Sequence, residues 1–353
     1  MSQQGVLLLN LGSPESLSVP AIREYLDEFL MDERVIDIPK WTRRLLVSYM
    51  LGPKKRPQVK LEEYGNIWTD EGSPLIVTSK RVQKKLQEQF SFPVDLAMTY
   101  AKPSIAEALD RLEKAGVTDL FIMPLYPQYA MSSYETVVVK TMTQIRERGN
   151  KFKVALLEPF FADEDYISAL VDASKPHLDA GFDHLLFTFH GIPERHLRKS
   201  DPSHEHCMVV KDCCSSCHPA HSTCYRHQCL RTAEEFVKAA GIPDEKYSIG
   251  FQSRLGRDPW LEPYTDQVLE AYGKKSFGKL LMISPAFVTD CLETLEEIGM
   301  AGAEEYKEAG GKDFELIPCL NEHPSWIEFL QGRIQKWLEG QTGSCKVGKL
   351  AQI

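Results

Sequence analysis

The stretch HLLFTFHGIP, residues 184–193, decides the class of fold. Its apolar residues follow one another almost without interruption, and they do not alternate with polar ones. Such a run is typical of a strand buried on both faces in a parallel sheet, and Gly191 and Pro193 mark the turn that ends it. We therefore expect His190 at the carboxyl end of a strand, where open parallel sheets bind their ligands.

Seven further apolar runs of this kind occur, with helical stretches between them. They span residues 6–10, 94–99, 120–125, 154–158, 247–252, 279–284 and 314–318. Strands that alternate with helices predict an α/β protein with parallel sheets. The strands divide four and four near the polar stretch RERGNK, residues 146–151, which suits a crossover between two sheets. We expect two domains, 1–151 and 152–323.

The composition is that of a globular protein, with 43% hydrophobic and 26% charged residues among 353. The net charge of -9 and the absence of a long Lys/Arg run argue against a nucleic-acid partner and favour a small ligand. No run approaches the roughly 18 apolar residues that span a bilayer. The chain starts MSQQ and continues into a strand without an export signal, so we expect a cytoplasmic protein.

A second candidate site follows the strand at 279–284, in DCLETLEEI, residues 290–298. On a helix, Asp290, Glu293 and Glu297 would share one face. One interpretation is a solvated acidic face, which suits the start of a helix because of the helix dipole. The other is a path for a divalent cation or for protons, since hard ions prefer carboxylate oxygens. The residues alone leave both open, and a lone histidine such as His190 is usually structural.

Six of the nine cysteines lie in the polar segment CMVVKDCCSSCHPAHSTCYRHQC, residues 207–229. In a reducing compartment a dense group of thiols more often binds metal than forms disulfides, and a metal would supply folding energy that this segment lacks. Zinc and an iron-sulfur cluster are both open, because His218 and His221 offer zinc-type ligands. Among these cysteines, Cys207, Cys214, Cys217 and Cys224 have the spacing C-x6-C-x2-C-x6-C, in which the central pair can bind one metal centre and the outer pair can complete the ligand shell. Cys213 is the neighbour best placed to replace one of them.

Sequence blocks spread over nearly the whole chain, to about residue 340, resemble the ferrochelatases. The blocks are VLLLNLGSP (6–14), YLDEFLMD (25–32), GSPL (72–75), PLYPQY (124–129), FHGIP (189–193), FQSR (251–254), PWL (259–261) and DCLETLEE (290–297). The resemblance implies two Rossmann-like domains, each a four-stranded parallel sheet flanked by helices, with residues 324–340 packing back on the first. It implies an enzyme that inserts ferrous iron into protoporphyrin IX to form haem.

By position, the resemblance implies that His190 and Glu293 are catalytic and that they bind the Fe²⁺ substrate together with Asp290 and Glu297. We assign proton abstraction to His190, because two pyrrole N–H protons must leave as the metal enters. The resemblance also implies porphyrin contacts at Leu11, Ser13, Tyr129, Ser132, Ser133 and Trp260. Two departures affect these contacts: Thr99 stands where relatives often carry arginine, and Ala301 where some carry an acidic residue.

The resemblance also chooses between the metals, since some bacterial ferrochelatases hold a 2Fe-2S cluster in an internal insert at this place, here about 200–229. It implies one cluster per chain, bound by Cys207, Cys214, Cys217 and Cys224. Cys229 corresponds to a position that is often cysteine in relatives without the insert. The stretch WTRRLLVSYML, residues 41–51, with KKR at 54–56, resembles the family's apolar lip and suits peripheral contact at the inner membrane face.

Three other functions fit parts of this pattern. A coproporphyrin ferrochelatase shares the same motifs, and a chelatase for another tetrapyrrole or metal shares the fold and part of the site. An iron-sulfur redox or sensor protein on a chelatase scaffold would keep the cysteines, but it would not need His190 and Glu293 together.

Overall fold

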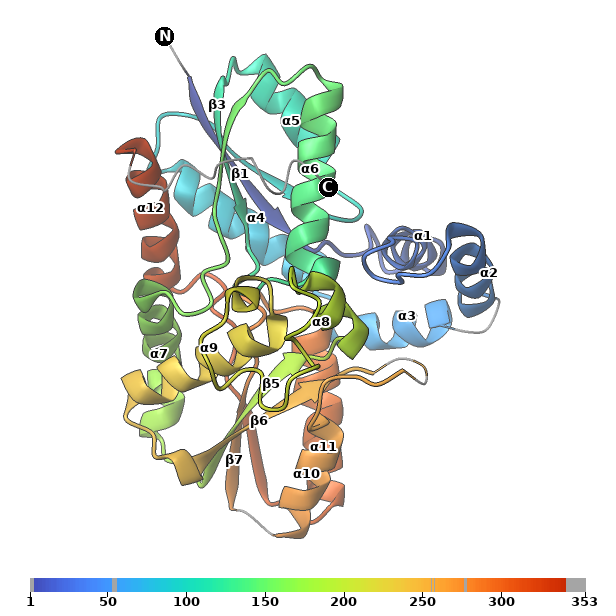
Figure 1. Ribbon diagram of the computed structural model, residues 1–353, viewed down its shortest axis with the longest axis vertical. Helices are drawn as coiled ribbons and strands as arrows, with labels where there is room; N and C mark the ends of the chain where they lie inside the picture. Colours follow the sequence, from blue (N-terminus) through green and yellow to red (C-terminus); the bar gives the residue numbers. More distant parts are fainter. Residues whose placement is uncertain (1–2, 53–55, 255, 257, 276–277, 341–353) are drawn as a thin grey trace. The chain divides into compact units, whose positions relative to one another are not determined.

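Two parallel sheets of four strands each organise the part of the chain that the structure describes (Figure 1). The structure is a computed structural model that describes residues 3–52, 56–254, 256, 258–275 and 278–340. All strand pairs within both sheets are parallel, which confirms the predicted α/β class. Each of the eight predicted apolar runs forms a strand.

The first sheet has the order β2-β1-β3-β4. Its strands are β1 (Gln4–Asn10), β2 (Val94–Met98), β3 (Asp119–Pro124) and β4 (Lys153–Leu156). The interior of β1 is fully buried, as the continuous apolar run predicts. β4 pairs with β3, so this sheet continues beyond residue 151, where the sequence analysis placed the domain boundary.

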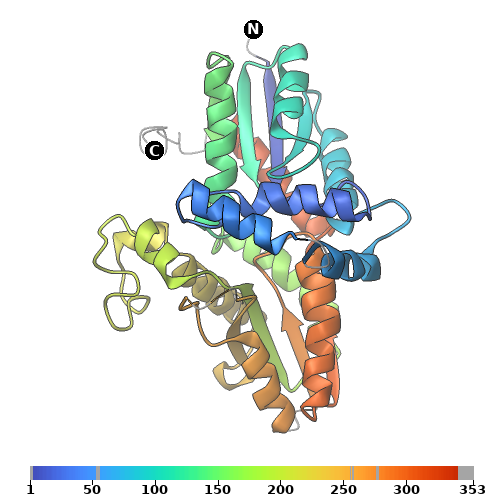
Figure 2. The ribbon, with the colours of Figure 1, turned by 90° about the vertical axis from the view of Figure 1, so that its right-hand side faces the viewer.

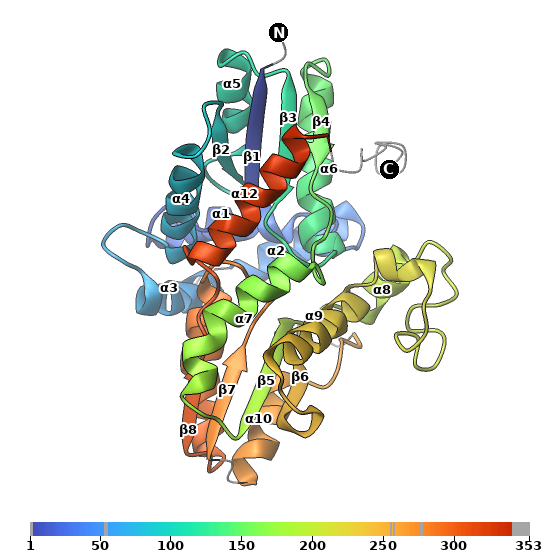
Figure 3. The same ribbon diagram turned by 90° about the vertical axis from the view of Figure 1, so that its left-hand side faces the viewer.

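Helices cover both faces of the first sheet. α4 (Pro74–Gln87) and α12 (Pro324–Leu338) lie on one face, and α5 (Ile105–Lys114) and α6 (Thr136–Glu147) on the other (Figures 1 and 3). α1 (Val19–Leu30), α2 (Lys40–Met50) and α3 (Arg56–Ile67) lie between β1 and α4 in the chain. A capping box of Ser104 and Glu107 fixes the start of α5, because each side chain accepts the other's backbone N–H.

The second sheet has the order β6-β5-β7-β8. Its strands are β5 (His184–His190), β6 (Tyr247–Gln252), β7 (Lys279–Ile283) and β8 (Asp313–Leu316). α7 (Glu164–Asp179) and α9 (Tyr225–Ala240) cover one face, and α10 (Thr265–Lys274) and α11 (Ala303–Glu308) cover the other (Figures 1 and 3). The cysteine-rich insert runs from α8 (Glu194–Ser200) through the short helix η2 (Pro219–Ser222) to α9, and η3 (Asp244–Lys246) precedes β6.

Contacts divide the chain into two units. The first contains residues up to 125, 131–158 and those from 327 on, and the second contains 126–130 and 159–326. Most of α12 therefore belongs to the first unit, where Trp337 stacks on Phe121 with ring centroids 5.3 Å apart. The loop 126–130 follows β3 but makes its contacts within the second unit.

Two π-helical segments, η1 (Met131–Glu135) and η4 (Glu293–Gly302), interrupt the regular helices. η1 follows β3 and its loop, and η4 follows β7. π-Helical turns are rare and are frequently found at functional sites. Both segments contain residues that the sequence analysis assigned to the substrate.

Candidate active site

His190 is the last residue of β5, at the carboxyl edge of the second sheet, and its side chain is half-buried. Its Nδ1 lies 2.7 Å from the carbonyl oxygen of Gly191. A carbonyl oxygen only accepts hydrogen bonds, so Nδ1 carries the proton and donates. In the neutral ring, Nε2 then keeps its lone pair. This tautomer leaves His190 a base or a metal ligand at Nε2.

The turn after His190 is held by two neighbouring segments. The Gly191 N–H donates to the carbonyl oxygen of Gln252 at 2.7 Å, and the Leu261 N–H donates to the carbonyl oxygen of Ile192 at 3.1 Å. A Cβ atom at Gly191 would lie 2.8 Å from the Gln252 oxygen, which explains the glycine. The same Cβ would lie 3.4 Å from the Trp260 ring, so the structure brings Trp260 against Gly191, the residue after His190.

Glu293 and Glu297 lie on η4, which follows the strand next to β5 in the sheet. The Glu297 carboxylate accepts a hydrogen bond from the Ser253 hydroxyl at 2.9 Å. Ser253 has a φ of 59°, in the left-handed region that non-glycine residues rarely adopt. The sequence analysis quoted Ser253 within FQSR but gave it no role. Its left-handed conformation and its bond to Glu297 make it part of the site.

Asp290 lies before η4, so the three carboxylates do not share one helix face as the α-helical spacing predicted. Its two carboxylate oxygens accept hydrogen bonds from the Asn321 side-chain amide at 2.6 Å, the Thr294 hydroxyl at 3.1 Å and the Cys319 N–H at 3.2 Å. These bonds join the start of η4 to the segment after β8. Asp290 therefore holds this edge of the site together.

Cys291 is a neighbour of Glu293 that the sequence analysis did not single out. The thiol is buried, and burial raises its pKa well above the ordinary value. Its contact with the Glu293 carboxylate raises the pKa further, because a thiolate there would face a second negative charge. Both effects favour the neutral thiol at Cys291.

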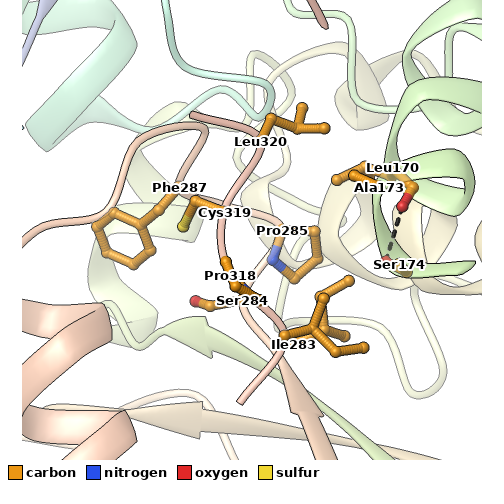
Figure 4. A pocket seen from close by; sticks show the side chains of 11 residues that line it. Leu170, Ala173, Ser174, Ile283, Ser284, Pro285, Phe287, Pro318, Cys319 and Leu320 are labelled. Carbon is orange, nitrogen blue, oxygen red and sulfur yellow. Dashed lines mark hydrogen bonds between the residues drawn. The ribbon is translucent and has the colours of Figure 1, made fainter. Parts of the chain in front are cut away.

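A small cavity lies beside this region, where the segments after β7 and β8 meet α7 (Figure 4). Its volume is about 10 Å³, which is room for about one water molecule. The Ser174 hydroxyl at its wall already donates to the Leu170 carbonyl oxygen at 2.7 Å. No predicted site residue lines this cavity.

In the first unit, predicted porphyrin residues follow β1 and β3 at the carboxyl edge of the sheet. Leu11 and Ser13 come after β1, and Ser132 and Ser133 lie on η1. The Ser13 hydroxyl is buried, and among the described residues it has no hydrogen-bond partner. A buried unpaired hydroxyl is costly, so this one is suited to a hydrogen bond with water or with a bound ligand.

The position of Thr99, where relatives often carry arginine, is approached by another cation. Lys140 Nζ lies 3.2 Å from the Thr99 carbonyl oxygen and 4.0 Å from the centre of the Tyr100 ring. It also lies 3.6 Å from Glu28 and 3.7 Å from Asp32. Lys140 thus brings a positive charge to this edge that the sequence analysis did not assign.

Thiols in the insert contact one another. Cys207 and Cys214 both lie near Cys224, and Cys213 lies beside Cys214. Burial raises the pKa of Cys207 to about 11. Contact with Cys224 raises the pKa of Cys214 as well. Cys207, Cys213 and Cys224 are buried, whereas Cys217 is exposed.

Asp201 orders the segment that carries Cys207. One carboxylate oxygen accepts the N–H groups of His206 and Cys207, both at 2.8 Å, and the other accepts the N–H and hydroxyl of Ser203. Burial alone would raise the pKa of Asp201, but these hydrogen bonds hold it below its usual value. A buried carboxylate with four donors fixes the loop around Cys207.

The histidines of the insert are engaged with the backbone and with one another. His206 Nε2 and His221 Nε2 lie 2.8 and 2.9 Å from the Cys213 carbonyl oxygen, and both must donate to it. His218 Nδ1 accepts the Ala220 N–H at 3.2 Å. Across the described ranges, no three His, Cys, Asp or Glu side chains are grouped to hold one metal ion.

The cysteine thiols of the insert have the chemistry that binds an iron-sulfur cluster. A 2Fe-2S cluster takes two cysteine ligands on each of two irons and does not need three ligands around one ion. Cys207, Cys214 and Cys224 supply neighbouring thiols, and burial raises the pKa of Cys207, which favours its protonated form when no cation is bound. Cys217 lies in the exposed part of the same segment.

α2 exposes an apolar face. The exposed fractions of Trp41, Leu45 and Tyr49, which recur every four residues, are 71%, 65% and 70%. Arg43 on the opposite side is buried and donates to the carbonyl oxygens of Ile36 and Ile38. Lys54 and Lys55 of the predicted lip lie outside the described residues. In the described part of the chain, no helix has the length and apolar character to cross a bilayer.

The fold is that of the metal chelatases. The solved structure titled "SirB from Bacillus subtilis with Fe3+" has a similar fold, with a TM-score of 0.55 over 97% of this chain and 99% of that one, at 13% identity. The cobalt complex of a sirohydrochlorin chelatase from Bacillus subtilis subspecies spizizenii has a TM-score of 0.54 over 96% of this chain and 98% of that one, at 11% identity. At these identities the likeness concerns the fold alone.

Sequence comparison gives the particular family. Residues 3–338 match the ferrochelatase family. The ferrochelatase of Opitutus terrae is 48% identical over 96% of this chain and 99% of its own length, and that of Pseudomonas syringae pv. tomato is 50% identical over 94% and 97%. The chain belongs to the ferrochelatase family, and it is an enzyme that inserts iron into a porphyrin for haem synthesis.

Proposed function

We propose that the protein inserts Fe²⁺ into protoporphyrin IX, with His190 as the base that receives pyrrole protons. The observation that carries this assignment is the hydrogen bond from His190 Nδ1–H to the Gly191 carbonyl oxygen, which leaves Nε2 as the acceptor. Trp260 packs against the turn after His190 and forms an apolar wall for the macrocycle. The ring bends so that its nitrogen lone pairs point toward the entering metal.

Glu293 and Glu297 handle the ions in this proposal. Their carboxylates bind Fe²⁺ after it has lost part of its water, or pass the released protons outward. The Ser253 hydroxyl orients Glu297, and Asp290 contributes its charge from the start of the path while its oxygens anchor the segment. Leu11, Ser13, Tyr129, Ser132 and Ser133 contact the porphyrin, and Ser13 has the unpaired hydroxyl that a ligand would satisfy.

The test is anaerobic Fe²⁺ insertion by the full chain into protoporphyrin IX and coproporphyrin, compared among matched variants. We expect His190→Ala to lower kcat by about 10²- to 10⁴-fold, the usual contribution of a positioned base. His177→Ala, a histidine on α7, should keep wild-type turnover. Glu293→Gln should lose activity and its neighbour Glu296→Gln should keep it.

Each outcome separates the possible functions. Turnover on protoporphyrin that depends on His190 supports the proposal, and a clear preference for coproporphyrin would replace the substrate but keep the chemistry. If neither porphyrin is turned over by protein that still shows cluster absorption, an iron-sulfur redox or sensor function would be the remaining alternative.

We also propose that the insert binds one 2Fe-2S cluster through Cys207, Cys214, Cys217 and Cys224. When bound, the cluster supplies folding free energy to a segment with few apolar groups. The closeness of Cys224 to Cys207 and Cys214, and the hydrogen bonds of His206 and His221 to the Cys213 carbonyl oxygen, favour ligation by cysteine rather than by histidine.

The fourth ligand is tested by a pair of single substitutions. We expect Cys217→Ser to lose the visible absorption and the bound iron and sulfide, and Cys213→Ser to keep them. The reverse result would make Cys213 the ligand, which its burial beside Cys214 allows. Stoichiometric zinc in the purified protein would contradict the cluster.

We further propose that the exposed face of α2 makes peripheral contact with a membrane surface. Aromatic and aliphatic side chains on one helix face partition into the headgroup region. Trp41→Ser and Tyr49→Ser should weaken sedimentation with anionic liposomes, and Val59→Ser, at an exposed valine of α3, should not. Equal sedimentation of all these variants would exclude a role for α2.

A further inference from the structure

Gln228 connects the cysteine insert to the loop 126–130, which carries Tyr129. It lies on α9, one turn after Cys224, and its exposed fraction is 1%. α9 begins where the insert ends (Figures 2 and 3). The insert and the loop 126–130 both belong to the second unit, so these contacts lie within one body.

The amide of Gln228 uses both of its ends. Its Oε1 accepts the Tyr129 N–H at 2.6 Å, and its Nε2 donates to the carbonyl oxygens of His221 and Ser222 at 3.1 and 3.0 Å. A backbone N–H can only donate and a carbonyl oxygen can only accept, so these partners fix the orientation of the amide. Only glutamine offers this acceptor and these two donors at this length.

A second residue of α9 holds the same loop without reaching the insert. The Thr232 hydroxyl accepts from the Gln128 side-chain amide at 2.9 Å and lies 2.8 Å from the Phe161 carbonyl oxygen. Thr232 is fully buried, one helical turn after Gln228. The loop is therefore attached to α9 at two points, and of these two only Gln228 also contacts the insert.

The partners of Gln228 in the insert belong to the segment that a cluster would order. His221 and Ser222 form the end of η2, and Cys224 caps the start of α9 two residues later. If this segment loses its order, Nε2 of Gln228 loses both acceptors in a buried position, and a buried unpaired donor costs about 1–3 kcal/mol. The amide would then rotate or shift, and the bond to Tyr129 would go with it.

We propose that Gln228 is a positioning residue that couples the state of the cysteine insert to the Tyr129 loop, and through that loop to porphyrin binding. The proposal rests on the proposed function, in which Tyr129 contacts the porphyrin and the insert holds a cluster. Loss of the cluster should then weaken porphyrin binding and leave the chemical step at His190 intact.

Hydrogen–deuterium exchange of the full chain tests the coupling without turnover. In the wild type, removal of the cluster by an iron chelator should speed exchange of the Tyr129 amide by about tenfold or more. In Gln228→Met, which keeps the side-chain length but no hydrogen bond, exchange should be fast with and without the cluster, with less than a twofold difference. Thr232→Val should retain the wild-type response to cluster removal.

A second variant covers the case in which Gln228→Met does not fold. Gln228→Glu keeps an acceptor for the Tyr129 N–H but loses both donors to the insert, so the amide should stay protected and no longer respond to the cluster. In turnover assays of the cluster-loaded protein, Gln228→Met should raise the KM for protoporphyrin IX several-fold, with kcat within twofold of wild type.

The coupling is wrong if cluster removal speeds exchange at Tyr129 equally in wild type, Gln228→Met and Gln228→Glu, or in none of them. That failure is distinct from a failure of the proposed function, which would appear as absent turnover in the wild type. An exchange response without any change in KM would keep the link to the loop and remove its effect on the porphyrin.

Discussion

At the scale of single residues, the site is defined by hydrogen bonds that fix one atom for chemistry. His190 and Glu297 are each held by a neighbour, the Gly191 carbonyl oxygen and the Ser253 hydroxyl. Each bond orients a side chain. His190 keeps Nε2 as an acceptor, and Glu297 has a second carboxylate oxygen. This arrangement is expected where a side chain must exchange a proton or an ion, because orientation lowers the cost of reaching the reactive geometry.

Replacing Ser253 should separate orientation from backbone strain. We expect Ser253→Ala and Ser253→Gly each to lower kcat/KM several-fold, because both remove the hydroxyl that bonds Glu297. Only the glycine variant should gain stability, since glycine adopts a φ of 59° without strain. Steady-state kinetics and thermal unfolding of both variants check this. Unchanged kcat/KM in both would exclude Ser253 from the site.

His184, at the start of β5, should make stability depend on pH. Burial lowers its pKa below the ordinary value of 6.5, and nearby Lys275 lowers it further. The unfolded chain therefore binds a proton at a pH where the folded chain does not, and stability falls as the pH drops below about 6.5. The contribution is complete above that pH.

Denaturant unfolding from pH 8 to 5.5 measures this effect. His184→Gln keeps a polar group near the Ser248 hydroxyl but cannot titrate, so its stability should fall less than that of the wild type over this range. Parallel pH profiles for the two proteins would contradict the prediction.

At the scale of elements, the insert depends on polar anchors rather than on an apolar core. Asp201 accepts four hydrogen bonds, and the Cys213 carbonyl oxygen lies within hydrogen-bond distance of two histidines. Val209 and Val210 in the same segment are exposed. Such a loop folds only when its polar groups and thiols are all paired, which explains why a metal cluster suits it.

Asp201→Asn should loosen the insert and reduce cluster content. Asparagine has one acceptor oxygen, so one pair of donors loses its partner, at a cost of about 1–3 kcal/mol for each buried group left unpaired. We expect lower iron and sulfide per chain and faster proteolysis between α8 and α9. Asp212→Asn, in an exposed part of the same loop, is the control and should keep full cluster content.

The two π-helical segments show how an element can serve a site. η1 and η4 each follow a central strand of their sheet, and each contains residues that we assign to the substrate. A π-helical turn breaks the regular i to i−4 bonding, and its cost is tolerated where it aims side chains that an α-helix would misplace. Asp290, by contrast, lies outside η4, and its carboxylate anchors the segment after β8.

At the scale of the whole molecule, α12 contributes a tryptophan to each unit. Trp326 is fully buried and packs with Phe160 and Tyr166 in the second unit. Trp337 stacks on Phe121 in the first unit and is only half-buried. α12 therefore contributes to the cores of both units.

Alanine at these two positions should destabilise different units. We expect Trp326→Ala to cost about 3–5 kcal/mol, as for other fully buried large aromatics, and Trp337→Ala to cost less because its ring is partly exposed. Calorimetry should show the transition of a different unit lowered in each variant. The same transition lowered in both would mean that the two units unfold as one.

The sequence by itself determined the strands, the α/β class and the residues near the carboxyl edges. Continuous apolar runs such as 184–189 have one low-energy arrangement, a strand buried on both faces, so a local pattern was sufficient. The family blocks around His190 and Glu293 were equally local. The boundary at 151 rested on a polar stretch, and only strand pairing shows that residues 153–156 join β3 in the first sheet.

Only the tertiary structure decided how these residues are held. The Ser253 bond to Glu297, the anchoring role of Asp290 and the link from Gln228 to Tyr129 join segments 31–99 residues apart in sequence. The sequence also did not predict the π-helical geometry of η4, because its spacing fits an ordinary α-helix. Local pattern reports burial, whereas the partner of a polar group depends on which distant segments folding brings together.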